Sequence, residues 1–306
     1  MKKSLAAVMA AVVIIPAAPA QAASVDVVRA VEKLVAAGAA GRVWQFASAA
    51  MPHDPRMDDL PRGSFPSTSF HVHTRGILRL GRSGIVSSDL RREVKANYWH
   101  VHFLKEDAAN GDRRDADLVK VFTRPQRLRT VGGVQYANGP AYGQKGWVNL
   151  GKAPGGAGLH GDQVIDIFEQ PTLKALIAKA TINRPSGAIV GVDNRAVVKK
   201  SWTIRGTITL TELFKLSPAF REMVGGPLHP RMRNLSLMWG ISADLSGRPI
   251  VVQTVLRTGK EDTDLEIGNV VSATRYGWDA KAAVTAPTAM RVKRVPFGDD
   301  ITDFFR

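Results

Sequence analysis

Two His-x-His pairs are the residues whose type and spacing best suit metal chemistry. His71 and His73 form the first pair and His100 and His102 the second, and apolar and polar residues alternate around both. Such alternation predicts β-strands, in which the two imidazoles of a pair share one face and could bind zinc or copper. A strand over residues 84–95 would separate the pairs by ~9–10 Å at ~4.8 Å per strand, too far for one ion. We therefore predict solvent-facing histidines and no metal site.

No recognisable catalytic motif accompanies these histidines. The chain has no Gly-x-Ser-x-Gly nucleophile elbow, no His-Glu-x-x-His zinc helix, no P-loop and no cysteine. The Gly-rich segment 151–158 lacks the Lys-Ser/Thr pair and the helix start of a phosphate cradle, so we expect a flexible loop. His160 and Asp162 could form a dyad, but a polar loop is the simpler interpretation. We predict a protein that is not an enzyme and needs no cofactor.

Basic residues outnumber acidic ones, with 42 Lys and Arg against 27 Asp and Glu and a formal net charge of +15. Such a surplus favours anionic partners, here an anionic membrane surface or a cell-wall polymer. Four arginines of the first predicted strands are the candidate contacts with that surface: Arg75, Arg79, Arg91 and Arg92. Aromatic stacking platforms and a reading helix are not evident in the sequence, so we predict no nucleic-acid partner.

The first residues have the pattern of a secretory signal peptide. Lys2 and Lys3 precede an apolar run over 5–15, and Ala20-Gln21-Ala22 is a small-x-small cleavage pattern. The run is shorter than the ~20 apolar residues needed to span a bilayer. We expect cleavage after residue 22 or 23, with loss of two lysines that lowers the charge from +15 to +13. The prediction is a secreted protein with one domain over 24–306, whose oligomeric state is left open.

The elements that must position these residues alternate between strand-rich and helical stretches. Apolar spacing predicts helices over 24–40 and 163–180 and from Thr211 to 224, with Pro171 kinking or restarting the second. Strands are predicted around both histidine pairs and over 84–95, 118–131, 133–136, 147–150, 202–210, 234–245, 249–257 and 266–276. The connections between them are predicted to include a loop over 51–69, a charged turn over 107–117 and a hairpin turn over 244–247. Strand groups joined by turns indicate an antiparallel sheet in an α+β fold, with the helices on one apolar face. The two strand groups could be two halves of one curved sheet.

The order of motifs in the C-terminal half resembles a known family. The strand 202–210 runs into a helix, 243–249 turns a hairpin with the pattern Asp-x-x-Gly-x-Pro, and 273–277 and 284–287 close the sheet. This order is similar to the actinobacterial LppX/LprG lipoproteins, which are related in shape to the periplasmic carrier LolA. The resemblance implies a half-barrel with helices on its concave face and an apolar cavity for acylated lipids. The anchor cysteine of that family is missing here, which implies a non-lipidated secreted form.

The resemblance also supplies candidate pocket residues. Seven large apolar side chains would line the cavity between sheet and helices: Phe168, Leu173, Leu176, Leu210, Leu213, Phe214 and Trp239. Without the resemblance, the same positions would be ordinary core. The sequence thus leaves two main hypotheses open, a carrier of acylated lipid or another apolar molecule, and an envelope interaction module that binds anionic polymer or membrane through its basic surface. A metal- or His-dependent hydrolase, which would use His71, His73, His100, His102 or His160, ranks last.

Overall fold

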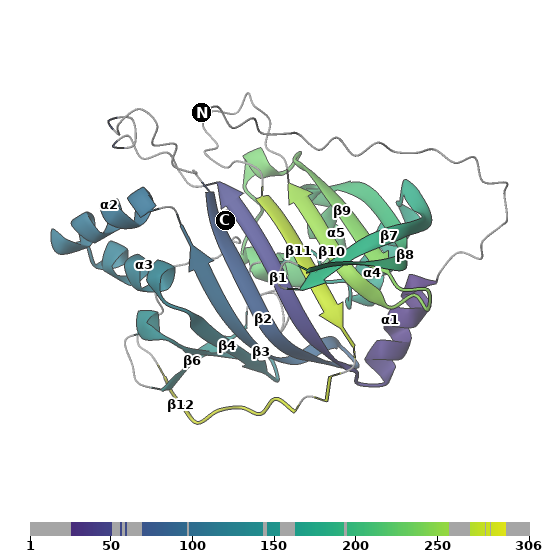
Figure 1. Cartoon of the computed structure of the whole chain (residues 1–306), viewed down its shortest axis with the longest axis horizontal. Helices are drawn as coiled ribbons and strands as arrows, with labels where there is room; N and C mark the ends of the chain where they lie inside the picture. The colour runs from purple at the N-terminus through teal and green to yellow at the C-terminus, as the bar shows by residue number, and fades with distance from the viewer. Residues whose placement is uncertain are drawn as a thin grey trace, which may run out of the picture.

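The computed structural model has one large curved sheet of twelve strands, with helices on one face (Figure 1). It describes residues 26–50, 56, 59, 69–96, 98–142, 146–153, 163–192, 195–256, 270–278, 280–281 and 283–291. The strand order is β12-β6-β5-β4-β3-β2-β1-β11-β10-β9-β8-β7, and all neighbours are antiparallel except β12 and β6. The sheet is open at both edges, so the predicted α+β class with a curved antiparallel sheet is confirmed.

The first half of the chain builds the sheet from its centre outward. Its elements are α1 (Val27–Ala36), β1 (Ala40–Ala50), β2 (Ser69–Gly81), β3 (Gly84–Lys95), α2 (Tyr98–Ala109), α3 (Arg113–Thr123), β4 (Gln126–Val131), β5 (Val134–Asn138), the 3₁₀ turn η2 (Pro140–Tyr142) and β6 (Trp147–Lys152). Strands β1 to β6 follow each other as antiparallel neighbours, and the α2–α3 hairpin is inserted between β3 and β4.

The second half builds the other side of the sheet and returns to its centre. Its elements are α4 (Gln170–Ala178), β7 (Ile182–Val192), β8 (Arg195–Thr209), α5 (Leu210–Leu216), α6 (Pro218–Val224), η3 (Pro230–Met232), β9 (Ser236–Ala243), β10 (Pro249–Leu256), β11 (Val270–Gly277) and β12 (Ala289–Arg291). The two halves join where β1 pairs with β11, from Arg42 opposite Gly277 to Ser48 opposite Val271. The prediction that the two strand groups form one curved sheet is therefore confirmed.

Local signals explain where the covering helices begin. Asp26 accepts a hydrogen bond from the backbone N–H of Arg29 at the start of α1, and Pro171 lies in the first turn of α4, where its missing N–H costs nothing. Thr209 and Glu212 form a capping box at α5. Hydrogen bonds from Lys179 and from the backbone and hydroxyl of Thr209 lower the pKa of Glu212 to about 2, so this cap stays ionised.

The covered face of the sheet carries the main core. Helices α1, α4, α5 and α6 bury apolar side chains such as Val31, Leu173, Leu213 and Phe220 against the inward residues of the central strands. Alternation along the strands places the intervening residues on the other face, as in Ser236–Ala243, where every second residue is buried. One face of the sheet is thus a packed interior and the other is available to solvent.

A short irregular segment, 163–169, seals the core in front of α4. The Gln163 side-chain carbonyl accepts hydrogen bonds from the hydroxyls of Thr274 and Tyr276 on β11. Glu169 accepts hydrogen bonds from the hydroxyls of Thr172 and Ser217, both at 2.5 Å. The segment therefore ties β11, α4 and the start of α6 together through buried polar groups.

Several sequence-based boundaries need correction. The helix expected over 24–40 ends at Ala36, and β1 begins at Ala40. The helix expected over 163–180 begins only at Gln170, because Pro171 lacks the N–H that a helix interior requires. Strand β7 was not predicted, and most of the expected loop over 51–69 and the predicted signal peptide lie outside the described residues.

The largest error concerns the region after β3. The second histidine pair belongs to helix α2, and the expected charged turn 107–117 contains the end of α2 and the start of α3. The expected strand 118–131 is helical as far as Thr123 and becomes β4 at Gln126. A five-residue alternation such as 99–103 is compatible with a strand and almost equally with a helical turn. Here the packing of α2 against α3 stabilises the helix.

Among the described helices, none has the length and apolar character required to cross a membrane.

Candidate functional site

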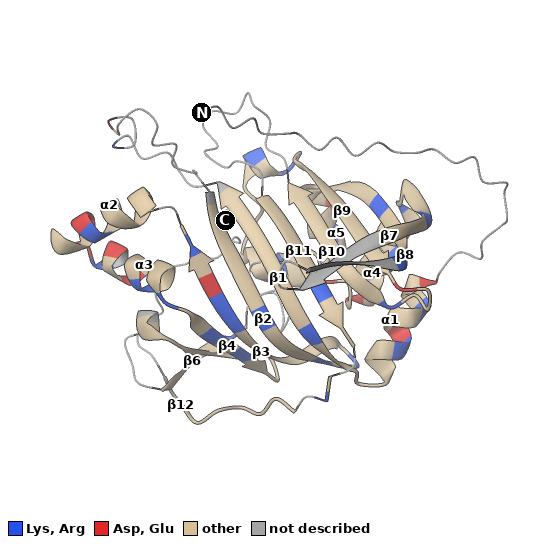
Figure 2. Ribbon diagram, in the orientation of Figure 1, with Lys and Arg blue, Asp and Glu red and all other residues tan. Residues whose placement is uncertain are grey.

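The face of the sheet that the helices leave uncovered, here called the open face, carries most of the unusual chemistry. It faces the viewer in Figure 1, and basic positions recur on its central strands in Figure 2. Residues at every second position of β1, β2, β3, β4 and β11 point to this side, including the exposed or half-buried Arg42, Trp44, Arg75, Arg91 and Arg127. The register of the strands determines which of them become neighbours.

Four arginines and one tryptophan form a line across five strands. Trp44 on β1 lies opposite Arg275 on β11 and opposite Arg75 on β2. Arg75 lies opposite Arg91 on β3, and Arg91 lies opposite Arg127 on β4. We call Arg275, Arg75, Arg91 and Arg127 the arginine row. Like charges directly opposite each other destabilise a sheet, so three adjacent arginines are an arrangement that the fold alone does not favour.

Acidic partners neutralise only part of the row. Arg91 donates from Nε to Glu93 at 3.1 Å, and Arg127 donates from Nε and Nη2 to Asp89 at 2.7 and 2.8 Å. The guanidinium groups of Arg75 and Arg275 have no hydrogen bond or ion pair with any residue that the structure describes. Within the described part of the chain, the row therefore keeps two guanidinium groups without an acidic partner, and Arg75 on β2 is the exposed one.

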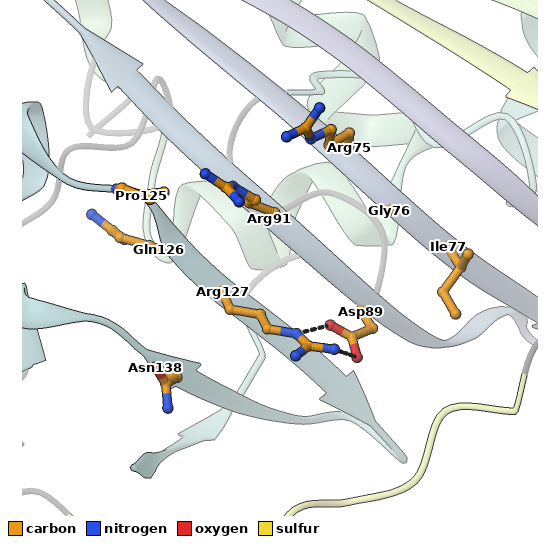
Figure 3. A pocket seen from close by; sticks show the side chains of 9 residues that line it. All are labelled: Arg75, Gly76, Ile77, Asp89, Arg91, Pro125, Gln126, Arg127 and Asn138. Carbon is orange, nitrogen blue, oxygen red and sulfur yellow. Dashed lines mark hydrogen bonds and ion pairs between the residues drawn. The ribbon is translucent and has the colours of Figure 1, made fainter. Parts of the chain in front are cut away.

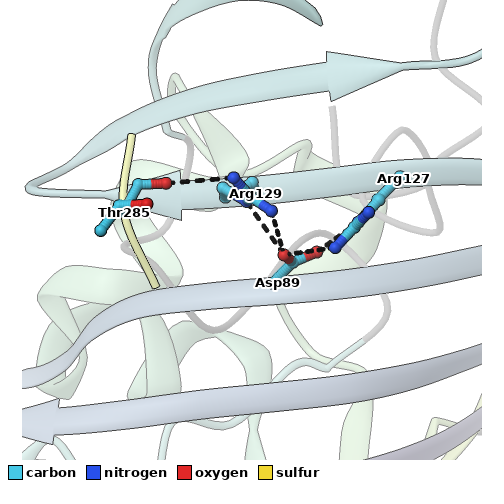
Figure 4. A network of polar contacts seen from close by, with 4 residues as sticks. All are labelled: Asp89, Arg127, Arg129 and Thr285. Carbon is cyan, nitrogen blue, oxygen red and sulfur yellow. Dashed lines mark hydrogen bonds and ion pairs between the residues drawn. The ribbon is translucent and has the colours of Figure 1, made fainter. Parts of the chain in front are cut away.

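Asp89 is held by two arginines at once (Figure 4). Arg129, directly opposite Asp89 on β4, donates to the same carboxylate from Nε at 3.0 Å and also from Nη2. Burial raises the pKa of Asp89, but the hydrogen bonds from Arg127 and Arg129 outweigh it and leave the pKa below its ordinary value. Asp89 is thus a fixed anion at one end of the row.

The rest of this network fixes Arg129. Its Nη1 donates to the backbone carbonyl of Thr285 at 3.1 Å, and its guanidinium carbon lies 4.7 Å from the ring centre of Trp147 on β6. Arg127 lies over the same ring at 5.6 Å. These cation–π contacts hold both guanidinium groups in place without neutralising their charge.

The arginine row lies between two hollows. The first has a volume of about 520 Å³ and is drawn in Figure 3. It is lined by Arg75, Gly76, Ile77, Asp89, Arg91, Pro125, Gln126, Arg127 and Asn138. Figure 3 shows Arg75, Arg91 and Arg127 on three successive strands around it. This hollow is the basic half of the site.

The second hollow has a volume of about 470 Å³ and shares Arg75 and Arg91 with the first. It is lined by Trp44, Gln45, Phe46, His73, Thr74, Arg75, Arg91, Glu93, Lys95, Ala273 and Arg275. Phe46 is 37% exposed and stacks on His71 with ring centres 5.6 Å apart, while His73 meets it edge-on at 5.3 Å. This hollow is the aromatic half of the site.

Burial and nearby positive charge lower the pKa of His73, which favours its neutral form. Burial lowers its pKa most, nearby Lys95 and His71 lower it further, and Glu93 on the opposite strand partly opposes them. Glu93 itself uses Oε1 to accept from Arg91, and its Oε2 has no partner in the described part of the chain. The aromatic half thus contains a carboxylate that uses only one of its oxygens in contacts with the described residues.

The four arginines predicted from sequence have different positions. Arg75 and Arg91 belong to the row, and Arg79 is exposed further along β2. Arg92 is only 2% exposed, so the prediction that it contacts an anionic surface is wrong. It follows Arg91 on a strand, where successive side chains point to opposite faces, and so it points into the covered side.

The sequence-based site residues omitted Arg127, Arg129, Arg275 and Trp44. Arg127 and Arg129 alternate with Leu128 on β4, and this alternation in the sequence is the signal that places both arginines on one face. Trp44 lies in β1, a strand that was not predicted. Arg275 stands 148 positions after Arg127, and only the pairing of β1 with β11 reveals their relation.

The two histidine pairs do not meet. His71 and His73 share one face of β2 as expected, whereas His100 and His102 lie on α2, where residues two apart point ~200° away from each other. His100 contacts Phe122 of α3, and His102 stacks on Tyr98 and lies 3.3 Å from Glu106. Within the described residues, no group of three or more His, Asp or Glu side chains could hold a metal ion.

The seven candidate pocket residues all belong to the covered side of the sheet. Six of them are buried in the main core, from Leu173 at 0% to Trp239 at 3% exposed, and Phe214 packs against that core. Neither of the two hollows on the open face is lined by any of them. Their part in binding an apolar ligand stays a prediction.

Comparisons with known proteins add no family. No protein-family model matches the chain, and no curated protein matches it. Among solved structures, an acetoacetate decarboxylase-like enzyme from Sphingomonas wittichii RW1 aligns with 83% of this chain and 96% of its own, at 8% identity and a TM-score of 0.12. A TM-score this low carries no argument about fold or activity, and the resemblance to the LppX/LprG lipoproteins stays a prediction.

Proposed function

We propose that the protein is a non-enzymatic binding protein whose open face holds a phosphate- or carboxylate-bearing ligand on the arginine row. The observation that carries this proposal is the alignment of Arg75, Arg91 and Arg127 on three neighbouring strands, where Asp89 and Glu93 are their only acidic partners among the described residues. A bound anion would relieve the repulsion between these groups. Planar guanidinium groups suit this role because they donate two parallel hydrogen bonds to one carboxylate or phosphate.

The sequence supports a site of this kind outside the cytoplasm. The predicted signal peptide would export the chain, and the net charge of +15 would draw it toward anionic components of the cell envelope. The proposal therefore follows the envelope-interaction hypothesis and gives it a defined surface. It assigns the ligand contact to Arg75 and Arg91, with Arg127 and Arg275 extending the same line.

The test is the binding of a long-chain polyphosphate to the purified protein, measured by calorimetry at several salt concentrations. We expect the double variant Arg75→Gln/Arg91→Gln to bind at least tenfold more weakly. Each phosphate contact contributes about one to the slope of log affinity against log salt, so the slope should fall by about two.

A matched control removes the same charge elsewhere. Arg29→Gln/Arg113→Gln takes two exposed arginines from α1 and α3, which contribute no residue to the row or to either hollow. It should change the affinity less than twofold. Equal weakening by both double variants would show attraction by net charge alone, and absence of binding by the unaltered protein would refute the proposal.

A second candidate function is the carriage of an acylated lipid or another apolar molecule on the covered side. One observation favours it: the indole N–H of Trp239 is buried without a hydrogen-bond partner in the described residues, amid the predicted pocket residues. A buried unpaired donor is costly, and a ligand carbonyl would satisfy it. We expect native mass spectrometry and organic extraction to find a bound acylated lipid. A protein that carries no lipid and gains none from vesicles contradicts this candidate.

A further inference from the structure

We infer that the ligand of the open face is an acidic polysaccharide, with its acidic groups on the arginine row and one sugar ring against Trp44 in the aromatic half of the site. This inference rests on the proposed function and specifies its ligand. It is carried by three features: the length of the row, the place of Trp44 within it, and the Oε2 atom of Glu93, which has no partner among the described residues.

The length of the row indicates a chain-like ligand. From Arg275 on β11 to Arg127 on β4 the row crosses five strands, about 19 Å at ~4.8 Å per strand. A single small anion would contact only one or two of these guanidinium groups. The two hollows share Arg75 and Arg91 in their linings, so the row and the hollows that border it offer a track for a linear polymer across the strands.

Trp44 places a ring within this track. It lies between Arg275 and Arg75 in the register and stacks on no other aromatic ring in the described part of the chain. The C–H groups of a pyranose ring pack well on an indole face, while its acidic substituents can reach guanidinium groups on either side. A polymer that alternates rings with anionic groups matches this order of side chains.

Glu93 favours a hydroxyl-bearing ring over a plain polyanion. Glu93 lines the same hollow as Trp44 and His73, and its Oε2 has no hydrogen-bond or ion-pair partner among the described residues. A carboxylate accepts hydrogen bonds from hydroxyl groups and repels phosphate groups. The hollow therefore suits a sugar unit, with the phosphates or carboxylates of the ligand held further along the row.

The aromatic half fits single-stranded nucleic acid less well. Such strands stack successive bases on successive aromatic platforms. Here the face of Phe46 is already taken by His71, with rings inclined by 25°, and His73 abuts its edge. In the aromatic half, this leaves the indole of Trp44 as a platform for a single ring. A planar membrane surface would likewise contact projecting side chains rather than hollows of about 470 and 520 Å³.

The experiment compares four probes on the purified protein and on Trp44→Ala. The probes are polygalacturonate, long-chain polyphosphate, oligo-deoxythymidine and vesicles of phosphatidylglycerol. We expect Trp44→Ala to weaken polygalacturonate binding at least tenfold and polyphosphate binding less than twofold. Tyr98→Ala, which removes an aromatic side chain 73% exposed on α2, is the matched control and should change neither affinity.

A measurement on the unaltered protein guards against a misfolded variant. In saturation-transfer NMR with an oligogalacturonate, irradiation of the aromatic protons should saturate the ring C–H protons of one sugar unit most strongly. Uniform saturation along the oligomer, or equal loss of polyphosphate and polygalacturonate binding in Trp44→Ala, would overturn the polysaccharide inference and leave the arginine row intact.

The other possible binding results would overturn either the polysaccharide inference or the proposed function. If the protein prefers oligo-deoxythymidine in a manner that depends on Trp44, the ring that packs on Trp44 is a nucleobase. If it prefers vesicles, the open face binds a membrane. Either result overturns the inference. If the unaltered protein binds none of the four probes, the proposed function itself fails.

Discussion

Gly76→Ala is expected to lower the free energy of unfolding by about 3 kcal/mol. Gly76 lies on β2 opposite Leu90 of β3, and a Cβ atom at this position would stand 2.0 Å from the backbone oxygen of Asp89 and 2.9 Å from the Cα of Leu90. These are backbone atoms of a paired strand, so no side-chain rotation can relieve the overlap. The two strands would have to separate, at the expense of the hydrogen bonds between them.

The same change should also damage the open face. The Arg75–Arg91 pair is the next pair along the two strands, and Gly76 itself lines the basic half of the site. Urea unfolding followed by circular dichroism gives the stability, and calorimetry with polyphosphate gives the affinity. Gly226→Ala is the control, because nothing lies within 4 Å of the added methyl group, and its stability should change by less than ~0.5 kcal/mol. If the two variants are equally stable, β2 and β3 have space for a methyl group at position 76, contrary to the backbone distances given above.

The fold could be predicted from the sequence where regular strand patterns, turn glycines or helix caps mark an element within a few residues. The strand over 236–243 alternates throughout, the strand over 249–256 is rich in valine, and the turn between them needs a residue of positive φ, which Gly247 supplies at 87°. Helices α5 and α6 begin directly after Thr209 and Ser217, whose hydroxyls cap them. Such signals are contained within a few residues, so no knowledge of distant contacts is required.

Helices α2 and α3 show where this approach fails. The apolar residues of α2 do not gather on one helix face, and only Phe103 and Leu104 of this helix are buried. Its stability comes from contact with α3, which is information about tertiary structure that a short alternation around His100 and His102 cannot contain. The strand prediction there followed the local pattern, and tertiary packing overrode it.

The candidate site was less predictable than the fold. Arg75 and Arg91 were found because a cluster of arginines is visible in the sequence, but their alignment with Arg127, Trp44 and Arg275 depends on the register of four strand pairs. A shift of one residue in any pair would send the arginines of that strand to the covered side. Arg92, one position from Arg91, shows this effect directly, since it is buried.

Asp166→Asn is expected to stabilise the protein at neutral pH and to remove a pH dependence of its stability. Burial raises the pKa of Asp166 to about 6, and the charge of Glu169 adds to this effect, while the backbone N–H of Phe168 partly opposes it. In the unfolded chain the pKa returns to its ordinary value near 3.8. The folded state therefore binds this proton more tightly than the unfolded state does.

The sign of the effect follows from this difference. Below about pH 4 the carboxyl group is protonated in both states and contributes its full stability, which is lost as the pH rises through about 6. A shift of about two units corresponds to about 3 kcal/mol. An asparagine keeps the oxygen that accepts from the Phe168 N–H at 2.8 Å but carries no charge, so the variant should gain about this much relative to the unaltered protein between pH 4 and pH 7.

Urea unfolding at pH 4, 5, 6, 7 and 8 measures this difference, and Asp244→Asn provides a control of opposite sign. Burial raises the pKa of Asp244, but hydrogen bonds from Ser246 and Arg248 outweigh it and leave the pKa below its ordinary value, so this carboxylate stabilises the fold once ionised. Its removal should cost stability at pH 7 and little at low pH. If the gain of Asp166→Asn is the same at every pH, Asp166 is not a buried charge in the folded protein, and the segment 163–169 that seals the core must be open to water.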